Sequence, residues 1–413
     1  MSLADAAERL VYRVAGLPVA VNGLFDTSGA EPQDILRCAF VNCYWNPQGF
    51  GDWAELAGAS ILWPLGLLAA CAWYTWRNGP VIRARCGKSI PAQIGEQLKL
   101  YFSDGVLAPW YYIFSLHDDG EGRARSFIQR FETKPCYFRL LKAKKGSPLN
   151  DKGRFAEYCA EHGIRTVPVL ARLDGRTFPP RLPDEDLFVK WVTGRGGRGA
   201  ERWDRTAPST FSSPAGARLS GDQLLHRLIH ESEHHPLLVQ SRMRPHPDLV
   251  PITTGALPTV RLLTCLDEAG KPGIMAAMLR TSLGRNRTVD NLHAGGIGAL
   301  IDIESGTLGE ASNLGSDARL GWFSAHPDTG AAIEGRAIPC WEEVKRQAVA
   351  AHRHFRDRVV VGWDIAILDD GPIVIEGNGN PDLDILQRFM RTGLREQKFA
   401  TLLAHHLRRR GAV

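Results

Sequence analysis

The sequence predicts a mixed α+β protein with a largely helical N-terminal extension. Short β-rich runs alternate with helical patterns from about residue 150 to the C-terminus, and the last two runs form a hairpin at 359–384. At 413 residues the chain is longer than one usual core, so we expect two or three subdomains. The extension, 1–149, should end in the basic run 140–151, where the sequence Gly-Ser-Pro is typical of a loop.

The composition is that of an ordinary globular protein, with 44% hydrophobic and 23% charged residues. A formal net charge of +5 is too small to indicate a nucleic-acid partner, although it suits an anionic substrate such as a nucleotide. The eight cysteines are scattered without a Cys-x-x-Cys pair, which favours reduced thiols over disulfides or a zinc site. The start of the chain lacks the pattern of a signal peptide, so a cytoplasmic location is expected.

Residues 56–76 are apolar and uncharged, and four basic residues follow between 77 and 88. The length suffices for one bilayer crossing, with Trp and Tyr near its end in interfacial positions. Pro64 and Gly66 interrupt the segment, however, which favours a buried or membrane-surface helix over a span. Peripheral contact with the inner face of the membrane stays open.

The elements after residue 150 are expected in a definite order. A helix should cover 152–162, capped by Asn150 or Asp151, because Phe155 and Cys159 recur at helical spacing. Strands should then lie ahead of the final hairpin, at 166–170, 187–192, 237–240, 260–266 and 274–279.

The hairpin at 359–384 carries the most specific chemical signal, because polar residues break two apolar strands around an Asp-Asp-Gly turn. Side chains alternate along a strand, so Glu376 and Asn378 share one face. A three-residue turn, with Gly371 in the left-handed conformation, would place Asp364 opposite Glu376 on that face. Mg²⁺ carried by a phosphate-bearing substrate would compensate these groups, and a surface hairpin with solvated polar groups is the alternative.

A second motif, 186–203, places a lysine on a strand before a glycine-rich loop. Glycines allow backbone amides to approach phosphate oxygens, and the lysine would add a point charge. The lysine precedes the glycines, so the motif is neither a Walker loop nor a Rossmann fingerprint. The alternative is a glycine-rich surface hairpin. The residues concerned are Lys190, Gly194, Gly196, Gly197 and Gly199.

Two further strands carry polar residues that suit a ligand. The run 237–243 turns polar at Gln240, where backbone groups can meet an adenine edge. Arg261 lies among strand residues and needs an anion, for which a phosphate, an oxyanion or a structural salt bridge would serve equally. Downstream lie Arg280 and a loop whose glycines allow close backbone approach to a ligand: Asp290, Asn291, Gly295 and Gly296.

In this combination the residues resemble the ATP-grasp superfamily over about residues 150–390. The likeness rests on Asp151-Lys152 before a helix, Lys190 with its glycines, Val239-Gln240, Arg261, and Asp364 with Glu376-Gly377-Asn378. Details such as TVRLLT, VDNLHAGGIGALIDIESG and VGWDIAILDDGPIVIEGN are similar to one branch, the sugar-transfer-associated ATP-grasp proteins, which are related to α-L-glutamate ligases.

The resemblance implies two α+β subdomains that clasp ATP, 150–245 with the lysines and hinge and 246–413 with the metal and substrate residues. The phosphate-binding lysines fall on Lys152 and Lys190, and the glycine loop would close over the β- and γ-phosphates. The adenine hinge falls on Gln240, Ser241 and Met243. Mg²⁺, with Mn²⁺ as an alternative, would be held by Asp364, Glu376 and Asn378.

The resemblance also implies a reaction. A small-molecule or sugar-linked carboxylate is phosphorylated to an acyl phosphate, which an amine attacks to give an amide, with Arg261 and Arg280 stabilising the developing charge. The substrate residues would include Asn291, Gly295 and Gly296, and the pathway would be that of a cell-surface polysaccharide. Two alternatives stay open: a kinase-like or ester-forming enzyme that acts on a hydroxyl, and a catalytically idle nucleotide-binding partner of a glycosyltransferase.

The chain departs from the family pattern in two places. Gln240 stands where many relatives carry Glu, and no acidic residue stands out as a ribose partner, with Asp248 the nearest candidate. Asn380 follows Asn378, but the spacing of two from Glu376 favours Asn378 as the ligand.

Overall fold

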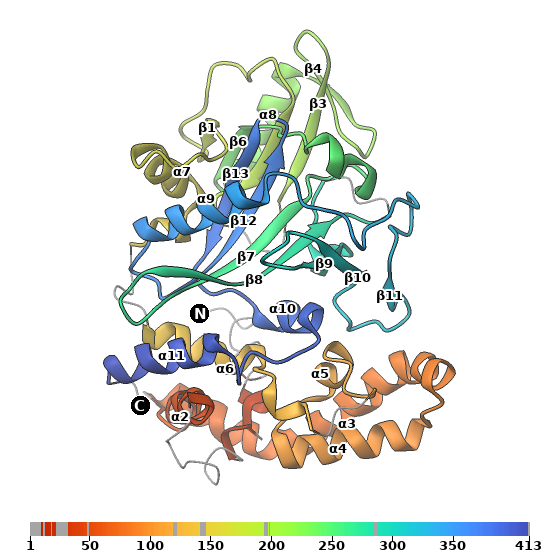
Figure 1. Ribbon diagram of the computed structural model, residues 1–413. Coiled ribbons are helices and arrows are strands. Elements are labelled where there is room, and N and C mark those ends of the chain that lie inside the picture. Colours follow the sequence, from red (N-terminus) through yellow and green to blue (C-terminus); the bar gives the residue numbers. More distant parts are fainter. Residues whose placement is uncertain are drawn as a thin grey trace.

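The computed structural model describes residues 10, 13–17, 19–21, 32–47, 49–118, 122–140, 146–193, 197, 199–284 and 288–411. Within these residues the fold is mixed α+β, with two antiparallel sheets and a helical N-terminal region. Figure 1 shows the N-terminal helices gathered at one end of the molecule, the seven-stranded sheet in the middle and the six-stranded sheet at the opposite end. The predicted fold class is confirmed.

The N-terminal region contains α2 (Pro32–Tyr44), α3 (Phe50–Cys86), α4 (Ile90–Asp104), α5 (Ala108–Ile113) and α6 (Arg130–Leu140). The predicted interruption at Pro64 and Gly66 is wrong, because α3 continues through both residues. One face of α3 packs against α4 and α5, and this burial offsets the hydrogen bond that a helical proline lacks. The segment 56–76 is not a buried helix either, since its aliphatic side chains are largely exposed.

The six-stranded sheet has the order β1-β6-β2-β3-β4-β5, and α7 (Lys152–Glu161) and α8 (Gly221–Ser232) pack beside it. The Asp151 side chain caps α7 by accepting the backbone N–H groups of Gly153 and Arg154, so the predicted helix and its cap are confirmed. The strands are β1 (Val169–Leu173), β2 (Leu187–Trp191), β3 (Glu201–Ala207), β4 (Thr210–Ser212), β5 (Arg218–Ser220) and β6 (Leu237–Ser241).

The first predicted strand, 166–170, is displaced to Val169–Leu173. Pro168 has no N–H to donate to a ladder, so regular pairing in this sheet begins after it. Thr166 instead forms an isolated bridge with Val374 of the other sheet. The stretch 166–173 therefore links the two sheets.

The seven-stranded sheet has the order β11-β10-β9-β8-β7-β12-β13. It is covered on one face by α9 (Trp341–His354) and on the other by α10 (Leu383–Met390) and α11 (Lys398–Arg409). The strands are β7 (Thr259–Leu266), β8 (Pro272–Thr281), β9 (Ile297–Ile301), β10 (Leu308–Ser312), β11 (Trp322–Phe323), β12 (Val360–Leu368) and β13 (Gly371–Asn378).

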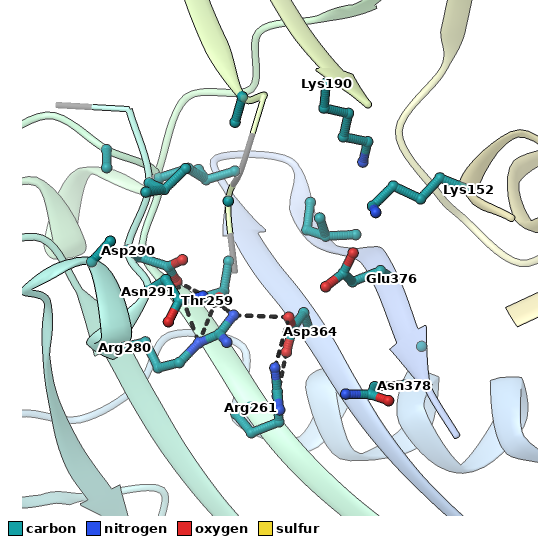
Figure 2. A pocket seen from close by; sticks show the side chains of 18 of the residues that line it. Lys152, Lys190, Thr259, Arg261, Arg280, Asp290, Asn291, Asp364, Glu376 and Asn378 are labelled. Atoms are coloured by element: carbon teal, nitrogen blue, oxygen red, sulfur yellow. Dashed lines mark hydrogen bonds and ion pairs between the residues drawn. The ribbon is translucent and has the colours of Figure 1, made fainter. Parts of the chain in front are cut away.

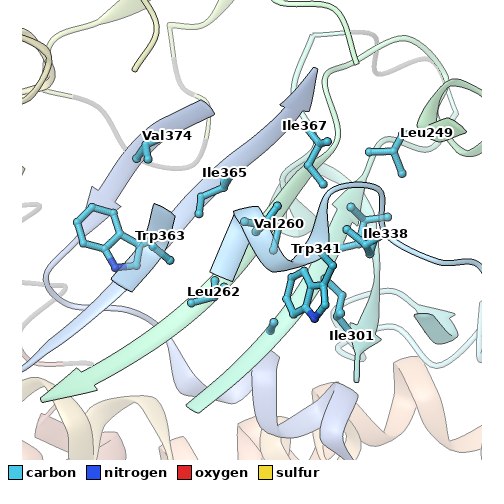
Figure 3. Close-up of a cluster of buried hydrophobic side chains, with 14 of the residues drawn as sticks. Leu249, Val260, Leu262, Ile301, Ile338, Trp341, Trp363, Ile365, Ile367 and Val374 are labelled. Atoms are coloured by element: carbon cyan, nitrogen blue, oxygen red, sulfur yellow. The ribbon is translucent and has the colours of Figure 1, made fainter. Parts of the chain in front are cut away.

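Alternation along β7 divides the core of this sheet in two. Leu262 packs with Trp363 and Trp341 on the α9 side, as Figure 3 shows. Its neighbour Leu263 belongs to the opposite cluster, which also contains residues of α2, α6, α10 and α11. The N-terminal helices α2 and α6 therefore share a core with the sheet, in contrast to helices joined only by a linker.

The predicted register of the final hairpin is confirmed, but the predicted cause is wrong. Asp364 pairs with Glu376, whereas Leu368 pairs with Gly371 across a two-residue turn, and Gly371 has φ +109°. The pairing shifts between Asp364 and Ile365, because Ile365 pairs with Val374 and leaves one residue of β13 bulged. A bulge adds one residue to one strand, so it restores the register that a three-residue turn would have given.

Candidate active site

A cleft of about 1280 Å³ is lined by residues of both sheets and of α6 and α7. It brings together most of the predicted site residues, which are Lys152, Lys190, Gly197, Gln240, Ser241, Met243, Arg261, Arg280, Asn291, Asp364, Glu376 and Asn378. Gly194 and Gly196 lie outside the described residues. Gly199, Gly295 and Gly296 do not line the cleft.

The three glycines outside the cleft have structural reasons for their conformations. Gly199 has φ +66°, and a Cβ there would overlap the Trp191 indole. A Cβ at Gly296 would lie 2.5 Å from the Asp290 carbonyl oxygen, and Gly295 ends a short 3-10 turn with φ +89°. These glycines shape the loops that border the cleft.

Two lysines point into the cleft from different elements. Lys190 lies on β2 and Lys152 is the first residue of α7, and Figure 2 shows both ammonium groups directed toward the space above Glu376. Burial lowers the pKa of Lys190 to about 8. The nearby positive charge of Lys152 also lowers this pKa, whereas the negative charge of Glu376 raises it. A buried ammonium group is stabilised by a bound anion, so this wall of the cleft suits phosphate.

Across the cleft, three charged residues lie side by side on adjacent strands. Arg261 of β7 is directly opposite Asp364 of β12, which is directly opposite Glu376 of β13. Directly opposed residues of antiparallel strands share one face of a sheet. The row Arg261–Asp364–Glu376 is therefore fixed by backbone pairing, and Figure 2 shows its side chains facing the cleft.

Asp364 holds two arginines. Arg261 donates through Nε to one carboxylate oxygen and through Nη2 to the other, the latter at 3.0 Å. Arg280 Nη2 lies 2.9 Å from Asp364 Oδ2. Burial alone would raise the pKa of Asp364, but the two guanidinium groups outweigh it and lower the pKa. The two arginines therefore favour the ionised form of Asp364.

Arg280 is also fixed on its other side. Its Nη2 donates to Thr259 Oγ1 at 2.6 Å, and the Thr259 hydroxyl in turn donates to Asp290 Oδ2. Burial would lower the Arg280 pKa, but Asp290 and Asp364 raise it. Burial raises the pKa of Asp290, although Arg280 opposes this change. Thr259 was not predicted from the sequence, and its spacing of two from Arg261 is the signal that could have identified it.

Glu376 and Asn378 offer oxygen atoms for a cation. Within the described part of the chain, the Glu376 carboxylate has no hydrogen-bond or ion-pair partner, although it lines the cleft. Among the described residues, Asn378 Oδ1 accepts only the backbone N–H of Asn380, at 2.9 Å. An oxygen-only donor set fits Mg²⁺ or Mn²⁺. Glu376 and Asn378 therefore fit the implied metal, whereas Asp364 would have to share its oxygens with the two arginines.

One end of the cleft is apolar. Val167, Met243, Leu257 and Ile375 belong to one apolar cluster and also line the cleft. The Gln240 side chain donates through Nε2 to the Val167 carbonyl oxygen at 3.2 Å, which ties β6 to the segment before β1. An apolar slot of this kind suits a flat heterocycle.

The other end of the cleft is basic and includes residues of the N-terminal region. Arg130 and Lys134 of α6 line it with Arg358, and Arg130 Nε lies 3.0 Å from Asp382. Arg358 is buried, which lowers its pKa, and its Nη1 makes no hydrogen bond to any described residue. Nothing in the sequence around these residues indicated a site, because only the tertiary fold brings α6 to the start of β12.

Comparison with known proteins gives one family and several distant structures. The family described as "Sugar-transfer associated ATP-grasp" matches residues 143–401. No curated protein matches the chain. D-alanine–D-alanine ligase from Bacillus anthracis is 13% identical over 64% of this chain and 68% of that chain, with a TM-score of 0.34.

Two further solved structures are similar at the same level. D-alanyl-alanine synthetase A from Vibrio cholerae O1 biovar eltor is 10% identical over 63% of this chain and 65% of that chain, with a TM-score of 0.37. N5-carboxyaminoimidazole synthetase from Staphylococcus aureus, complexed with ADP, is 11% identical over 57% of this chain, with a TM-score of 0.32. The chain spans about two thirds of the Bacillus anthracis and Vibrio cholerae proteins, but only 46% of the Staphylococcus aureus protein.

Proposed function

The chain belongs to the sugar-transfer-associated ATP-grasp family, and from this premise we propose that it is an ATP-dependent ligase that joins a carboxylate to an amine. The observation that carries the proposal is the arrangement of charge across one cleft. Two lysines face a row of arginine and carboxylate side chains, so both a triphosphate and an acyl group have partners there. The family description supports a role in sugar transfer, and we extend this to the biosynthesis of a cell-surface polysaccharide.

The nucleotide would occupy the cleft from its apolar end to the lysines. Val167, Leu257 and Ile375 would enclose the adenine, with backbone groups at Gln240, Ser241 and Met243 along its edge. Lys152 and Lys190 would bind the phosphate oxygens as point charges. Gly197 has φ +78° and lines the cleft, so its backbone can approach a phosphate where a side chain would be strained.

Mg²⁺, or Mn²⁺ in its place, would be held by Glu376 and Asn378, with Asp364 as a shared third ligand. When bound, the cation would offset negative charge on the phosphate oxygens. Every other contribution comes from backbone and side-chain groups of the chain itself.

In the proposed reaction, a carboxylate oxygen attacks the γ-phosphorus as the bond to the ADP oxygen breaks, which gives an acyl phosphate and ADP. The amine then attacks the acyl carbon, and phosphate leaves as the amine loses a proton to solvent. Arg261 and Arg280 would stabilise charge on the acyl phosphate and on the tetrahedral oxyanion. Asp364, Thr259 and Asp290 hold these guanidinium groups in place, so little reorganisation is needed.

The basic end of the cleft supports an anionic acceptor. Arg130, Lys134 and Arg358 gather there, and the buried Arg358 is stabilised if a carboxylate or phosphate of the acceptor binds beside it. A sugar acid or a phosphorylated sugar has this chemistry.

Isotope transfer tests the reaction. Purified protein is incubated with Mg·ATP and a matrix of carboxylates, including sugar acids and amino acids, against a panel of amines, and ADP release identifies active pairs. A productive carboxylate is then labelled with ¹⁸O. Transfer of one ¹⁸O atom to phosphate, dependent on the amine, is expected for an acyl phosphate.

Other outcomes identify the alternatives. ADP release with a phosphorylated or acylated hydroxyl as product would establish a kinase-like or ester-forming enzyme. Tight nucleotide binding without turnover for any pair would favour an idle partner of a glycosyltransferase. The lysines and the oxygen donors that line the cleft argue against an idle partner.

A further inference from the structure

Helix α3 carries an uninterrupted apolar stripe on its exposed side. Exposed residues recur along it at steps of three or four, which places them on one helical face. Ile61, Leu65 and Leu68, in the middle, are 75%, 68% and 58% exposed. The residues of this stripe, in order, are Phe50, Ala54, Ala57, Ile61, Leu65, Leu68, Ala72, Trp76, Pro80 and Arg83, and of these only the last is polar.

Aromatic side chains border this stripe. Trp53 lies near one end and Trp73 near the other, at 60% and 55% exposure, and Trp76 is 72% exposed. Phe102 of α4 extends the surface sideways, with its ring 6.5 Å from that of Trp63. Tryptophan favours the boundary between lipid headgroups and acyl chains, because it combines a large apolar ring with an N–H donor.

Among the described residues α3 is the one helix long and apolar enough to cross a bilayer, with a mean hydropathy of 1.7 in its most apolar window and 22% of that window buried. Its inner face argues against a crossing. Thr75 accepts a hydrogen bond from Gln97 at 2.7 Å, and Asn78 accepts the backbone N–H of Ala318 at 2.8 Å. These partners would be lost if α3 left the protein for the hydrocarbon, which is costly for buried polar groups.

The charges around the stripe have one sign. Between residues 50 and 104, every exposed charged side chain is basic, namely Arg77, Arg83, Arg85 and Lys99. The acidic residues of this segment, Asp52, Glu55, Glu96 and Asp104, are half-buried or buried. A surface of this kind is attracted to anionic headgroups.

We propose that α3 is a membrane-docking helix that lies in the plane of an anionic bilayer, with its apolar stripe at the acyl boundary and Arg83 among the headgroups. The combination of an apolar stripe, tryptophans and a purely basic exposed rim fits a lipid surface, whereas another protein would not require all three. Figure 1 shows α3 and α4 at the end of the molecule away from the six-stranded sheet, and no residue of the stripe lines the cleft. Docking therefore leaves the cleft accessible.

Vesicle flotation of the purified full-length chain tests the proposal. Vesicles are made of phosphatidylcholine alone or mixed with phosphatidylglycerol, and binding is expected mainly to the mixture. The double variant Leu65→Gln, Leu68→Gln is expected to bind at least about tenfold more weakly, since it places two polar groups at the acyl boundary. Arg83→Glu is expected to reduce binding chiefly at low salt.

The matched control is Phe178→Gln, Val250→Gln, which changes two apolar side chains of 49% and 52% exposure outside the stripe. It should bind like the unmodified chain. Equal binding by the Leu65, Leu68 variant would overturn the proposal. Resistance of the vesicle-bound chain to alkaline carbonate extraction would also overturn it, because it indicates a helix that spans the bilayer. A third contrary result is a failure to bind vesicles together with a dimer in sedimentation that the double variant abolishes, because a second copy of the chain would then cover the stripe.

Discussion

Asp364 lies directly opposite Arg261 in the sheet and binds it through both carboxylate oxygens, while a second arginine, Arg280, reaches the same carboxylate from β8. One buried anion thus positions two cations. The arrangement separates the roles of the two carboxylates in the cleft, because Asp364 makes hydrogen bonds and ion pairs with protein groups, whereas Glu376 makes neither with any described residue. The two carboxylates should therefore respond differently to substitution.

Asp364→Asn should destabilise the protein. Among the described residues, it leaves Arg261 without its carboxylate partner and Arg280 with Asp290 as its one remaining carboxylate, and breaking a buried ion pair costs about 3–5 kcal/mol. We expect a loss of about 3 kcal/mol in the free energy of unfolding, since the cleft admits water to the arginines. Denaturant unfolding without nucleotide measures it, and a loss below about 1 kcal/mol would show that the pairs contribute little.

Glu376→Gln should leave stability within about 1 kcal/mol of the unmodified chain, because the described structure gives this carboxylate no hydrogen bond or ion pair to lose, and only its longer-range attraction to Lys190 is removed. Its effect should fall on Mg·ATP, whose affinity is expected to drop at least tenfold, since removal of groups that support a metal costs about 10- to 100-fold. Calorimetric titration with and without Mg²⁺ checks this. Asn380→Ala is the matched control, because it retains the backbone N–H that Asn378 accepts. Unchanged Mg²⁺ dependence in Glu376→Gln would remove Glu376 from the metal site.

The sequence predicts the strands of this site well and its turns poorly. Apolar runs with β-branched residues identify β2, β6, β7, β8 and the hairpin, because a buried strand must be apolar whatever its neighbours are. The sequence predicts the pairing of Asp364 with Glu376 for the wrong reason. A bulge in one strand and a turn longer by one residue shift the paired residues by the same amount. Pattern alone does not distinguish them.

The missed residues are missed for a different reason. Arg358, Arg130 and Lys134 come from segments far apart in sequence, and only packing of α2 and α6 against the seven-stranded sheet brings them to one cleft. Periodicity carries information about a residue's own element, whereas such contacts depend on how elements pack. The course of α3 through Pro64 depends on packing in the same way.

Arg358→Leu should affect the acceptor and spare the nucleotide. Arg358 is buried at the basic end of the cleft, and its Nη1 lacks a hydrogen-bond partner among the described residues. A hydrogen bond to a charged group is worth about 1.5–3 kcal/mol, so the KM for the acceptor should rise about 10- to 100-fold. ATP affinity should stay within about twofold, and folding stability should change little, because the ion pair that Arg358 makes with Asp357 is long, at 3.6 Å, and a buried charge is removed. A change in ATP affinity with no change in KM would place the acceptor elsewhere.

Lys190 should make nucleotide affinity depend on pH. Burial lowers its pKa to about 8 in the free protein, and bound phosphates should raise the pKa again by their charge. Below pH 8 the ammonium group is already charged, so affinity should be constant there. As the pH rises through 8, free Lys190 loses its proton and binding must take one up, so affinity should fall about tenfold per pH unit until the pKa of the complex is reached. Titration of ATP between pH 6.5 and 9.5 measures the slope, with Lys190→Met as the control that should bind more weakly but without this dependence.

The pH dependence of folding stability should have the opposite sign. The unfolded chain retains the ordinary pKa of 10.5, so between about pH 8 and 10.5 it binds more protons than the folded chain, and the contribution of Lys190 to stability should increase with pH. Opposite slopes for affinity and stability, both absent in Lys190→Met, would identify this lysine as a buried phosphate ligand, whereas a flat affinity profile would exclude it from the nucleotide site.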